Sequence, residues 1–380
     1  MHGRARTILF VCTEDWFFYS HFRPLAEAAR QADDDVRLVL ATNVSKKSEA
    51  LERLGIEVIP YAITRGSLHP LSVWRDIRRF RRIIRRLRPD IVHFIALQPI
   101  LTAALGRISM RAAVFHITGL GTLAEGDSAR IRLLRGILFR LLVRHVRRLE
   151  CTLLFENPDD VRYVRWYGLP EDANITILGG AGVDPERFAA LSDPGDDGII
   201  VAYVGRLITT KGVDVLVKAM GEPILREQGV ELDIYGNADP GNLGAYTREC
   251  IEEWAGLPYV HWHGFTEDIP GIWKRAAICV VPTRTREGLP RAMLEAAACA
   301  RPLVVTDVPG CRHFVRDGVE GFVVPPENPQ ALAGAIAKLA GDRELRERMG
   351  RAARARLMEG FTEEKVIEAV GKVYQRLLRG

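Results

Sequence analysis

The chain has 380 residues, 47% of them hydrophobic and 27% charged, which is typical of globular cores and excludes a disordered tail or a fibre. Its six cysteines form no CxxC pair, so we expect reduced packing residues of a cytosolic protein and neither a disulfide framework nor a zinc site. The net charge is +5, and no apolar run approaches the ~20 residues of a membrane span, so we expect neither secretion nor membrane insertion.

Short apolar segments alternate with helical patterns from residue 7 onward, which is typical of parallel sheets flanked by helices. In the first half of the chain, the alternation predicts strands at 7–12, 35–42, 57–62, 90–96, 112–117, 151–156 and 175–178. These strands are expected to form one doubly wound sheet.

Two predicted helices of this half, at 74–88 and 130–148, combine an apolar stripe with many arginines. The stripes alone favour helices that pack on a core, but basic amphipathic helices also lie on anionic bilayers. Because both helices fall in the N-terminal half, we expect contact with an anionic membrane surface, with the protein bound peripherally at the inner face of the cell membrane. No aromatic-interleaved basic strand accompanies them, so we expect no nucleic acid partner.

A polar stretch rich in Gly, Pro and Asp at 191–198 interrupts the alternation and is interpreted as an interdomain linker. Beyond it, the pattern predicts strands at 199–204, 231–235, 259–263, 277–281, 302–306 and 321–324, and then helices at 328–339, 343–358 and 363–378. The fold class is therefore α/β, with two doubly wound, Rossmann-like domains at 1–190 and 198–360. The last segment, 361–380, is expected to pack back on the first domain. Such sheets bind ligands beyond the carboxyl ends of their strands, so we expect the active site in a cleft between the domains.

The loop after the strand at 199–204 contains Gly205-Arg206 and Lys211-Gly212, just before a predicted helix. Arginine offers a planar fork of donors and lysine a compact charge, and the two together suit a diphosphate. The alternative is a surface loop that carries two solvated cations.

Two glutamates, Glu287 and Glu295, flank the start of a helix predicted at 291–300. Between them, the turn Gly288-Leu289-Pro290 presents backbone N–H groups of the kind that bind anions. An acidic residue near a helix start is common, because it favours the positive end of the helix dipole, and this alone would explain Glu287. Combined with the two cations of the earlier loop, however, the pair predicts a sugar-nucleotide site.

The order and spacing of these motifs resemble those of the family 4 retaining glycosyltransferases, which have the two-domain GT-B fold, over nearly the whole chain. The motifs that carry the resemblance are Gly205-Arg206, Lys211-Gly212, Glu287-Gly288-Leu289-Pro290, Leu294-Glu295-Ala296, Pro302-Leu303-Val304-Val305, Val308-Pro309-Gly310-Cys311, Asp317-Gly318 and Gly321. Each piece is weak alone, whereas their common order is specific.

The resemblance implies a role for each matching residue of the second domain. Arg206 and Lys211 would hold the donor diphosphate and assist its departure. Glu295 would bind the ribose hydroxyls, and Glu287 the hydroxyls of the transferred sugar. Backbone amides at Gly288, at Leu289 and beside Pro290, which itself has no N–H, would complete a phosphate cradle.

Two further turns of the second domain match donor-binding segments of the family. Gly264-Phe265, preceded by His263, matches a turn that contacts the nucleotide base. Tyr235-Gly236-Asn237 stands where a Gly-x-Gly is more usual. The resemblance therefore implies donor contacts at both turns, with the role of Asn237 open.

In the first domain, the resemblance places acceptor and catalytic groups on the loops after the first, fourth and fifth strands. Ser20-His21 and Gly119-Leu120-Gly121 resemble the branch that extends lipid-linked oligosaccharides for surface glycans such as O-antigen. The implied acceptor contacts are Glu14, Ser20, His21, Gly119 and Gly121. His116 would contact the donor sugar as a catalytic group, and a satisfied core histidine is the alternative.

The function implied is transfer of a hexose or N-acetylhexosamine from a UDP-sugar to a polyprenyl-diphosphate-linked saccharide, with retained anomeric configuration. We expect no cofactor and no metal, because no DxD-like cluster follows a strand and the two cations can neutralise the leaving diphosphate. Two alternatives stay open: a UDP-N-acetylhexosamine 2-epimerase-like enzyme, and a non-catalytic sugar-nucleotide-binding partner of a glycan-assembly complex.

Overall fold

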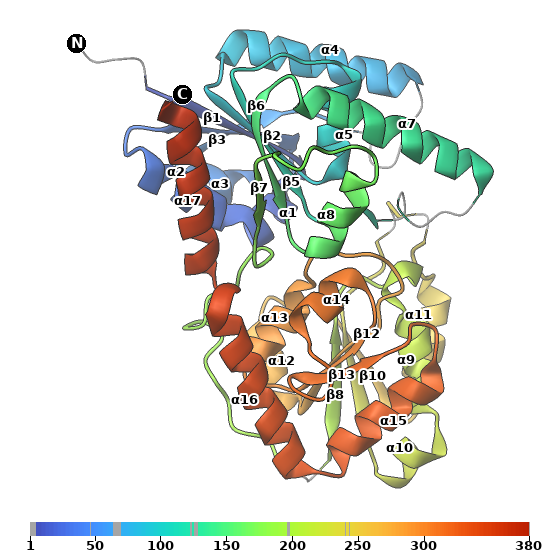
Figure 1. The fold of residues 1–380 in the computed structure, drawn as a ribbon. Helices are drawn as coiled ribbons and strands as arrows, with labels where there is room; N and C mark the ends of the chain where they lie inside the picture. Colours follow the sequence, from blue (N-terminus) through green and yellow to red (C-terminus); the bar gives the residue numbers. More distant parts are fainter. Residues whose placement is uncertain are drawn as a thin grey trace. The chain divides into compact units, whose positions relative to one another are not determined.

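The computed structural model describes residues 5–45, 47–63, 70–121, 124, 128–195, 198–239, 241–242 and 244–379 (Figure 1). The chain divides into two compact units. Unit 1 comprises Met1–Gly182 and Glu363–Gly380, and unit 2 comprises Val183–Thr362. The C-terminal helix therefore belongs to unit 1, together with the N-terminal part of the chain.

Unit 1 is built on a parallel sheet of seven strands in the order β3-β2-β1-β4-β5-β6-β7. The strands are β1 (Thr7–Glu14), β2 (Arg37–Asn43), β3 (Ile56–Pro60), β4 (Ile91–Ile95), β5 (Ala112–Ile117), β6 (Glu150–Phe155) and β7 (Ile175–Ile177). Central strands are apolar on both faces, as a sheet covered by helices on both sides requires. The strand order reverses direction between β1 and β4, which makes this sheet doubly wound.

Helices cover both faces of this sheet. They are α1 (Asp15–Phe17), the π-helical turn η1 (Phe18–Phe22), α2 (Arg23–Ala32), α3 (Ser48–Arg53), α4 (Pro70–Leu87), α5 (Leu97–Leu105), α7 (Ala129–Val146), α8 (Pro158–Arg165) and α17 (Glu363–Arg379). Residues of α4, α5 and α7 share one buried cluster with the sheet, and residues of α2 and α17 share another.

The C-terminal helix α17 runs beside α2 (Figure 1). Its Tyr374 is buried, and the phenol shares a hydrogen bond of 2.5 Å with Nδ1 of His93 on β4. Val370, Val373 and Leu377 are buried on the same side of the helix. The end of the chain thus completes the core of unit 1.

Unit 2 repeats the design with six parallel strands in the order β10-β9-β8-β11-β12-β13. The strands are β8 (Ile200–Val204), β9 (Glu231–Tyr235), β10 (Val260–Gly264), β11 (Ile278–Val281), β12 (Leu303–Thr306) and β13 (Gly321–Val324). The helical elements are the 3-10 turn η2 (Thr209–Lys211), α9 (Val213–Met220), α10 (Pro223–Glu227), α11 (Arg248–Ala255), α12 (Ile269–Arg275), α13 (Arg291–Ala298), α14 (Pro309–Phe314), α15 (Pro329–Ala340) and α16 (Arg343–Gly360). The predicted class, α/β with two doubly wound parallel sheets, is confirmed.

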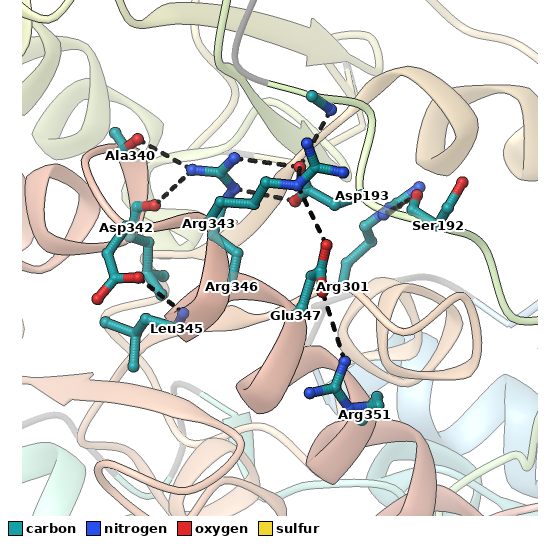
Figure 2. A network of polar contacts seen from close by, with 12 residues as sticks. Ser192, Asp193, Arg301, Ala340, Asp342, Arg343, Leu345, Arg346, Glu347 and Arg351 are labelled. Atoms are coloured by element: carbon teal, nitrogen blue, oxygen red, sulfur yellow. Dashed lines mark hydrogen bonds and ion pairs between the residues drawn. The ribbon is translucent and has the colours of Figure 1, made fainter.

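The segment expected to link the domains is partly anchored within unit 2 (Figure 2). Both carboxylate oxygens of Asp193 accept hydrogen bonds from the buried guanidinium of Arg346 on α16, at 2.9 and 3.1 Å. Arg301 donates to the carbonyl of Ser192 at 2.8 Å. The division between the units falls at Gly182 and Val183 instead of at 191–198, because these arginines hold the polar stretch in place. Residues 196 and 197 of the predicted linker lie outside the described residues.

Helices α4 and α7 leave part of their apolar stripes uncovered. On α4, Phe80 is buried, whereas Trp74 is 53% exposed with the guanidinium of Arg78 4.4 Å above its ring. The first half of α7 exposes four aliphatic side chains, Ile131, Leu133, Leu134 and Ile137. The alternative of a core-facing stripe thus accounts only for the buried part of each helix. None of the helices that the structure describes has the length and apolar character needed to cross a membrane.

Candidate functional site

The predicted donor-binding loops of unit 2 both lie at the point where the strand order reverses. Strands β8 and β11 are neighbours, and the loops that follow them carry Arg206 with Lys211 and Glu287, respectively. Ligands of doubly wound sheets bind at this reversal, beyond the carboxyl ends of the strands. The topology therefore places these loops where a ligand is expected.

Lys211 and Glu287 are in direct contact. The ammonium of Lys211 donates a hydrogen bond of 2.5 Å to Glu287 Oε2, and the two side chains are 24% and 16% exposed. The loops approach closely because Gly212 is in the left-handed region, with φ of 68°, and a Cβ there would lie 2.1 Å from the Pro282 carbonyl oxygen. No other residue type fits at Gly212 without moving one of the loops.

A second close approach lies beside Glu287. A Cβ on Gly310, in the first turn of α14, would lie 1.6 Å from the carbonyl oxygen of Gly288. Leu289 is buried, and Pro290 forms the N-cap of α13. The turn predicted to cradle the phosphate is therefore packed, backbone against backbone, on the first turn of α14.

Glu295 lies on the second turn of α13, and its side chain is 8% exposed. Arg291 donates to Glu295 Oε1 from Nε at 2.8 Å, one helical turn earlier. Arg291 is not among the residues predicted from the sequence, although a spacing of four residues on a helix is the signal that predicts such a pair.

Arg206 is oriented by Asp239, which is likewise not among the residues predicted from the sequence. Its Nη1 donates to Asp239 Oδ2 at 2.9 Å, while its carbonyl accepts a hydrogen bond of 2.9 Å from the Tyr203 hydroxyl. Burial, and next the charge of Glu287, raises the pKa of Tyr203 well above its usual value, and Arg206 opposes this shift. Tyr203 therefore lies within electrostatic range of both Arg206 and Glu287.

The thiol of Cys311 on α14 lies within electrostatic range of both Lys211 and Glu287. Its pKa is raised well above the usual value by burial and then by Glu287, and it is lowered by Lys211. Two cations and two carboxylates, together with the backbone of the Gly288 turn, are thus the groups that could hold a ligand in unit 2. Among the residues that the structure describes, no three His, Cys, Asp or Glu side chains are arranged as a metal-ligand set.

The other two predicted donor turns contact each other. Gly236 has φ of 143°, and a Cβ there would lie 1.8 Å from the Gly205 carbonyl oxygen, so only glycine fits. Its N–H donates to the Gly264 carbonyl at 2.7 Å. The next residue, Asn237, accepts a hydrogen bond from the N–H of Leu207 at its carbonyl. Beyond Gly264, the ring of Phe265 is 70% exposed and free of core packing.

The side chain of Tyr235 has partners within unit 2. Its ring stacks on that of His263, with centroids 4.6 Å apart, and its hydroxyl donates to Asp233 Oδ2 at 3.1 Å. The pKa of Tyr235 rises to about 12 through burial and then through Asp233. The donor contact of Tyr235 stays a prediction.

The predicted acceptor residues of unit 1 lie in two places, at or just after the end of β1 and just after β5. Glu14 ends the strand and accepts a hydrogen bond from the Asn43 amide at 3.0 Å. Ser20 and His21 lie on the π-helical turn η1, with Ser20 Oγ 2.6 Å from His21 Nδ1. Gly119 and Gly121 follow β5 and have positive φ angles of 120° and 53°.

His116 is fully buried within unit 1. It lies near the end of β5, with the rings of Phe22 and His93 at centroid distances of 5.4 and 5.7 Å. Its Nε2 lies 3.5 Å from the carboxylate of Glu156. Burial and then the neighbouring His116 hold the pKa of His93 well below its usual value. The donor-sugar contact of His116 stays a prediction, and its surroundings are those of a core histidine.

Family models match both halves of the chain. The model described as "Glycosyl transferase 4-like" matches residues 7–152, and the one described as "Glycosyl transferases group 1" matches residues 198–342. A similar protein from Campylobacter jejuni, N,N'-diacetylbacillosaminyl-diphospho-undecaprenol alpha-1,3-N-acetylgalactosaminyltransferase, is 24% identical over 94% of this chain and 96% of its own length.

Solved structures share the fold over nearly the whole chain. Sucrose-phosphate synthase from Thermosynechococcus elongatus matches with a TM-score of 0.80 and 19% identity, over 98% of this chain and 99% of its own. The Anabaena protein Alr3699/HepE, in complex with UDP and glucose, matches with a TM-score of 0.74 and 17% identity, over 96% and 98% of the two chains.

Proposed function

The chain belongs to the family 4 glycosyltransferases of GT-B fold, and we propose that it transfers a hexose or N-acetylhexosamine from a UDP-sugar to a polyprenyl-diphosphate-linked saccharide. The anomeric configuration of the sugar is retained, and the product serves surface-polysaccharide assembly. The observation that carries this proposal is the contact between Lys211 and Glu287 at the reversal of the unit 2 sheet.

The chemistry of transfer explains why a cation and a carboxylate stand together. Cleavage of the sugar–phosphate bond places negative charge on the departing diphosphate, and Lys211 with Arg206 stabilises it. Glu287, released from Lys211 by the diphosphate, accepts hydrogen bonds from the sugar hydroxyls. Each such charge contact is worth roughly 2 to 4 kcal/mol of barrier, about 10²- to 10³-fold in rate.

Two further groups complete the donor site. Glu295, held in place by Arg291, accepts hydrogen bonds from the ribose hydroxyls. The exposed ring of Phe265 offers a stacking surface to the base. The loops after β1 and β5 of unit 1, with Glu14, Ser20-His21 and the Gly119–Gly121 turn, contact the acceptor.

The comparisons support the choice of donor and acceptor. The Campylobacter jejuni relative is named for transfer to a diphospho-undecaprenol-linked saccharide, and the Anabaena structure holds UDP and glucose. The UDP of the Anabaena structure carries a diphosphate, which is the group that Arg206 and Lys211 suit.

We place the working enzyme at the inner face of the cell membrane, where a polyprenyl-linked acceptor resides. The supporting observation is the set of exposed apolar side chains on the arginine-rich helices α4 and α7. Exposed apolar side chains on an arginine-rich helix are typical of peripheral attachment to anionic lipid.

A transfer assay tests this proposal. Radiolabelled UDP- and GDP-sugars are offered with polyprenyl-diphosphate-linked saccharides, and we expect label to pass to the lipid from a UDP-sugar. A chelator should leave the rate unchanged, because the cations of the loop replace a metal, and NMR of the product should show the donor's anomeric configuration. Epimerised nucleotide without acceptor would favour an epimerase. Binding of nucleotide without any turnover would favour a non-catalytic partner.

A further inference from the structure

Arg284 lies in the same loop as Glu287 and connects that loop to the one carrying Lys211. Its Nη1 donates to the carbonyl of Thr209 at 2.6 Å, and its backbone N–H donates to the carbonyl of Thr210 at 2.9 Å. The hydroxyl of Thr283 donates to the same Thr210 carbonyl at 3.1 Å. Three donors from adjacent residues thus converge on the two residues that precede Lys211.

The 3-10 turn η2, which accepts these hydrogen bonds, has few hydrogen bonds of its own. The 3-10 turn η2 contains only three residues, and its internal bonds are those from Lys211 N–H to Ile208 and from Gly212 N–H to Thr209. On its other side, the N–H of Thr209 donates to the Gly244 carbonyl at 2.7 Å. A lysine side chain with four rotatable bonds gains a fixed position only if its backbone is fixed.

The guanidinium of Arg284 is itself held by two carboxylates and a phenol. Its Nη2 donates to Asp214 at 2.7 Å and to Glu327 at 3.3 Å, and its Nη1 lies 3.4 Å from the Tyr246 hydroxyl. Tyr246 in turn donates to Asp214. One arginine therefore joins the Lys211 loop, the start of α9, the segment before α11 and the loop before α15.

This arrangement keeps its charges throughout the neutral range. Burial alone would raise the pKa of Asp214, but hydrogen bonds from Arg284 and Tyr246 outweigh it and hold the pKa below its usual value. Burial, followed by the bond to Asp214, raises the pKa of Tyr246 to about 12. Asp214 is therefore a carboxylate, and Tyr246 a neutral phenol, at neutral pH.

We propose that Arg284 is a positioning residue, which fixes the Lys211 loop against the Glu287 loop and thereby sets where the Lys211 ammonium meets the donor diphosphate. The inference rests on the proposed role of Lys211. Arg284 acts through Lys211 and does not touch the donor, so its loss should matter only while Lys211 is present.

A double-mutant comparison with UDP as the probe tests this role. Affinity is measured by calorimetry for the full chain, for Arg284→Met, for Lys211→Ala and for the double variant, with Lys218→Ala on the exposed face of α9 as the control. We expect Arg284→Met to weaken UDP binding by about 10-fold in the wild-type background. In the Lys211→Ala background, the same change should cost less than about 2-fold.

A second measurement does not depend on nucleotide binding. Acylation of lysines by an N-hydroxysuccinimide ester, read by mass spectrometry, should find Lys211 slower to react than Lys218 in the wild type. In Arg284→Met, and in Arg284→Lys if the methionine variant does not fold, the reaction of Lys211 should become several-fold faster while that of Lys218 stays the same.

The outcomes separate this inference from the function beneath it. Unchanged acylation of Lys211, or an equal loss of UDP affinity in the two backgrounds, overturns the positioning role of Arg284. If Lys211→Ala binds UDP as well as the wild type, the proposed diphosphate contact fails, and the acylation rates then decide the positioning role by themselves.

Discussion

The ammonium of Lys211 and the carboxylate of Glu287 share a hydrogen bond of 2.5 Å although 76 positions separate them in the chain. Each is the group that a nucleotide-sugar would draw away from the other: the diphosphate attracts the lysine, and the sugar hydroxyls attract the glutamate. The pair therefore keeps both charged groups in the loops before a donor arrives, and donor binding would exchange their mutual contact for contacts with the donor.

Removing either member of this pair should stop turnover without unfolding the protein. We expect Lys211→Ala and Glu287→Gln each to lower kcat/KM by at least about 100-fold, because each removes one charge contact from the transition state. Steady-state kinetics measures this, with Lys218→Ala as the matched control at an exposed site. A variant of either residue that keeps near-wild-type turnover would remove that residue from the site.

The ion pair of Asp193 and Arg346 should be essential to the stability of unit 2. Arg346 is fully buried, and Asp193 is almost so, which means that Asp193→Asn leaves a buried cation without its counter-charge. We expect a loss of about 3 to 5 kcal/mol in the free energy of unfolding. Hydrogen exchange at the amides of α16 measures it.

Two variants sharpen this test. Glu347→Gln, at a neighbouring carboxylate that is only partly buried, should change the stability by less than about 0.5 kcal/mol. The double variant Asp193→Leu/Arg346→Met should lose less than the sum of its parts, because no buried charge remains. Additive losses would show that the two side chains contribute separately and not as an ion pair.

The strands could be predicted because parallel strands covered on both faces are almost continuously apolar. Those at Ala112–Ile117, Glu231–Tyr235 and Gly321–Val324 were predicted to the residue. Strand β1 extends beyond its predicted end to Glu14, which pairs with Asn43 across an irregularity in the register. The composition of 191–198 indicated a linker, yet Asp193 is buried by arginines that the local pattern does not reveal.

The site was predictable as a set of motifs but not as a set of contacts. Arg206, Lys211 and Glu287 lie in loops that follow predicted strands, and Glu295 lies on the helix after the second of these loops. The partners Asp239 and Arg284 lie far along the sequence from the residues that they contact. The strand order β9-β8-β11 brings their loops next to the loop after β8. Alternation of strands and helices does not specify that order.

Acidification should weaken unit 1 through His93. Burial keeps this histidine neutral in the folded protein, whereas the unfolded chain takes up its proton below pH 6.5, the ordinary pKa. The unfolded state then binds more protons, so the free energy of unfolding should fall by about 1.4 kcal/mol per pH unit below that point, until the depressed pKa is reached.

Urea unfolding between about pH 7.5 and 5.5 measures this slope in the wild type and in His93→Gln, which cannot titrate there. In the variant, the slope of the unfolding free energy with pH should be smaller by the contribution of about one proton. Equal slopes in the two proteins would show that His93 is protonated within the fold.

The exposed apolar side chains of α4 and α7 should bind the protein to anionic vesicles. We expect co-sedimentation at low ionic strength and release at about 1 M salt, where the Debye length falls to about 3 Å. The pair Arg78→Glu and Arg82→Glu should weaken binding, whereas the same reversals at Arg248 and Lys218 of unit 2 should not. If the protein does not bind the vesicles at low salt, α4 and α7 serve only to cover the sheet of unit 1, and the predicted membrane contact is wrong.

A crystal structure of the full chain with a non-hydrolysable UDP-sugar bound would locate the donor directly. We expect the diphosphate within hydrogen-bond distance of the Lys211 ammonium and the Arg206 guanidinium, with Glu287 turned to the sugar and Glu295 to the ribose. A nucleotide bound elsewhere, with the Lys211–Glu287 pair intact, would contradict this expectation.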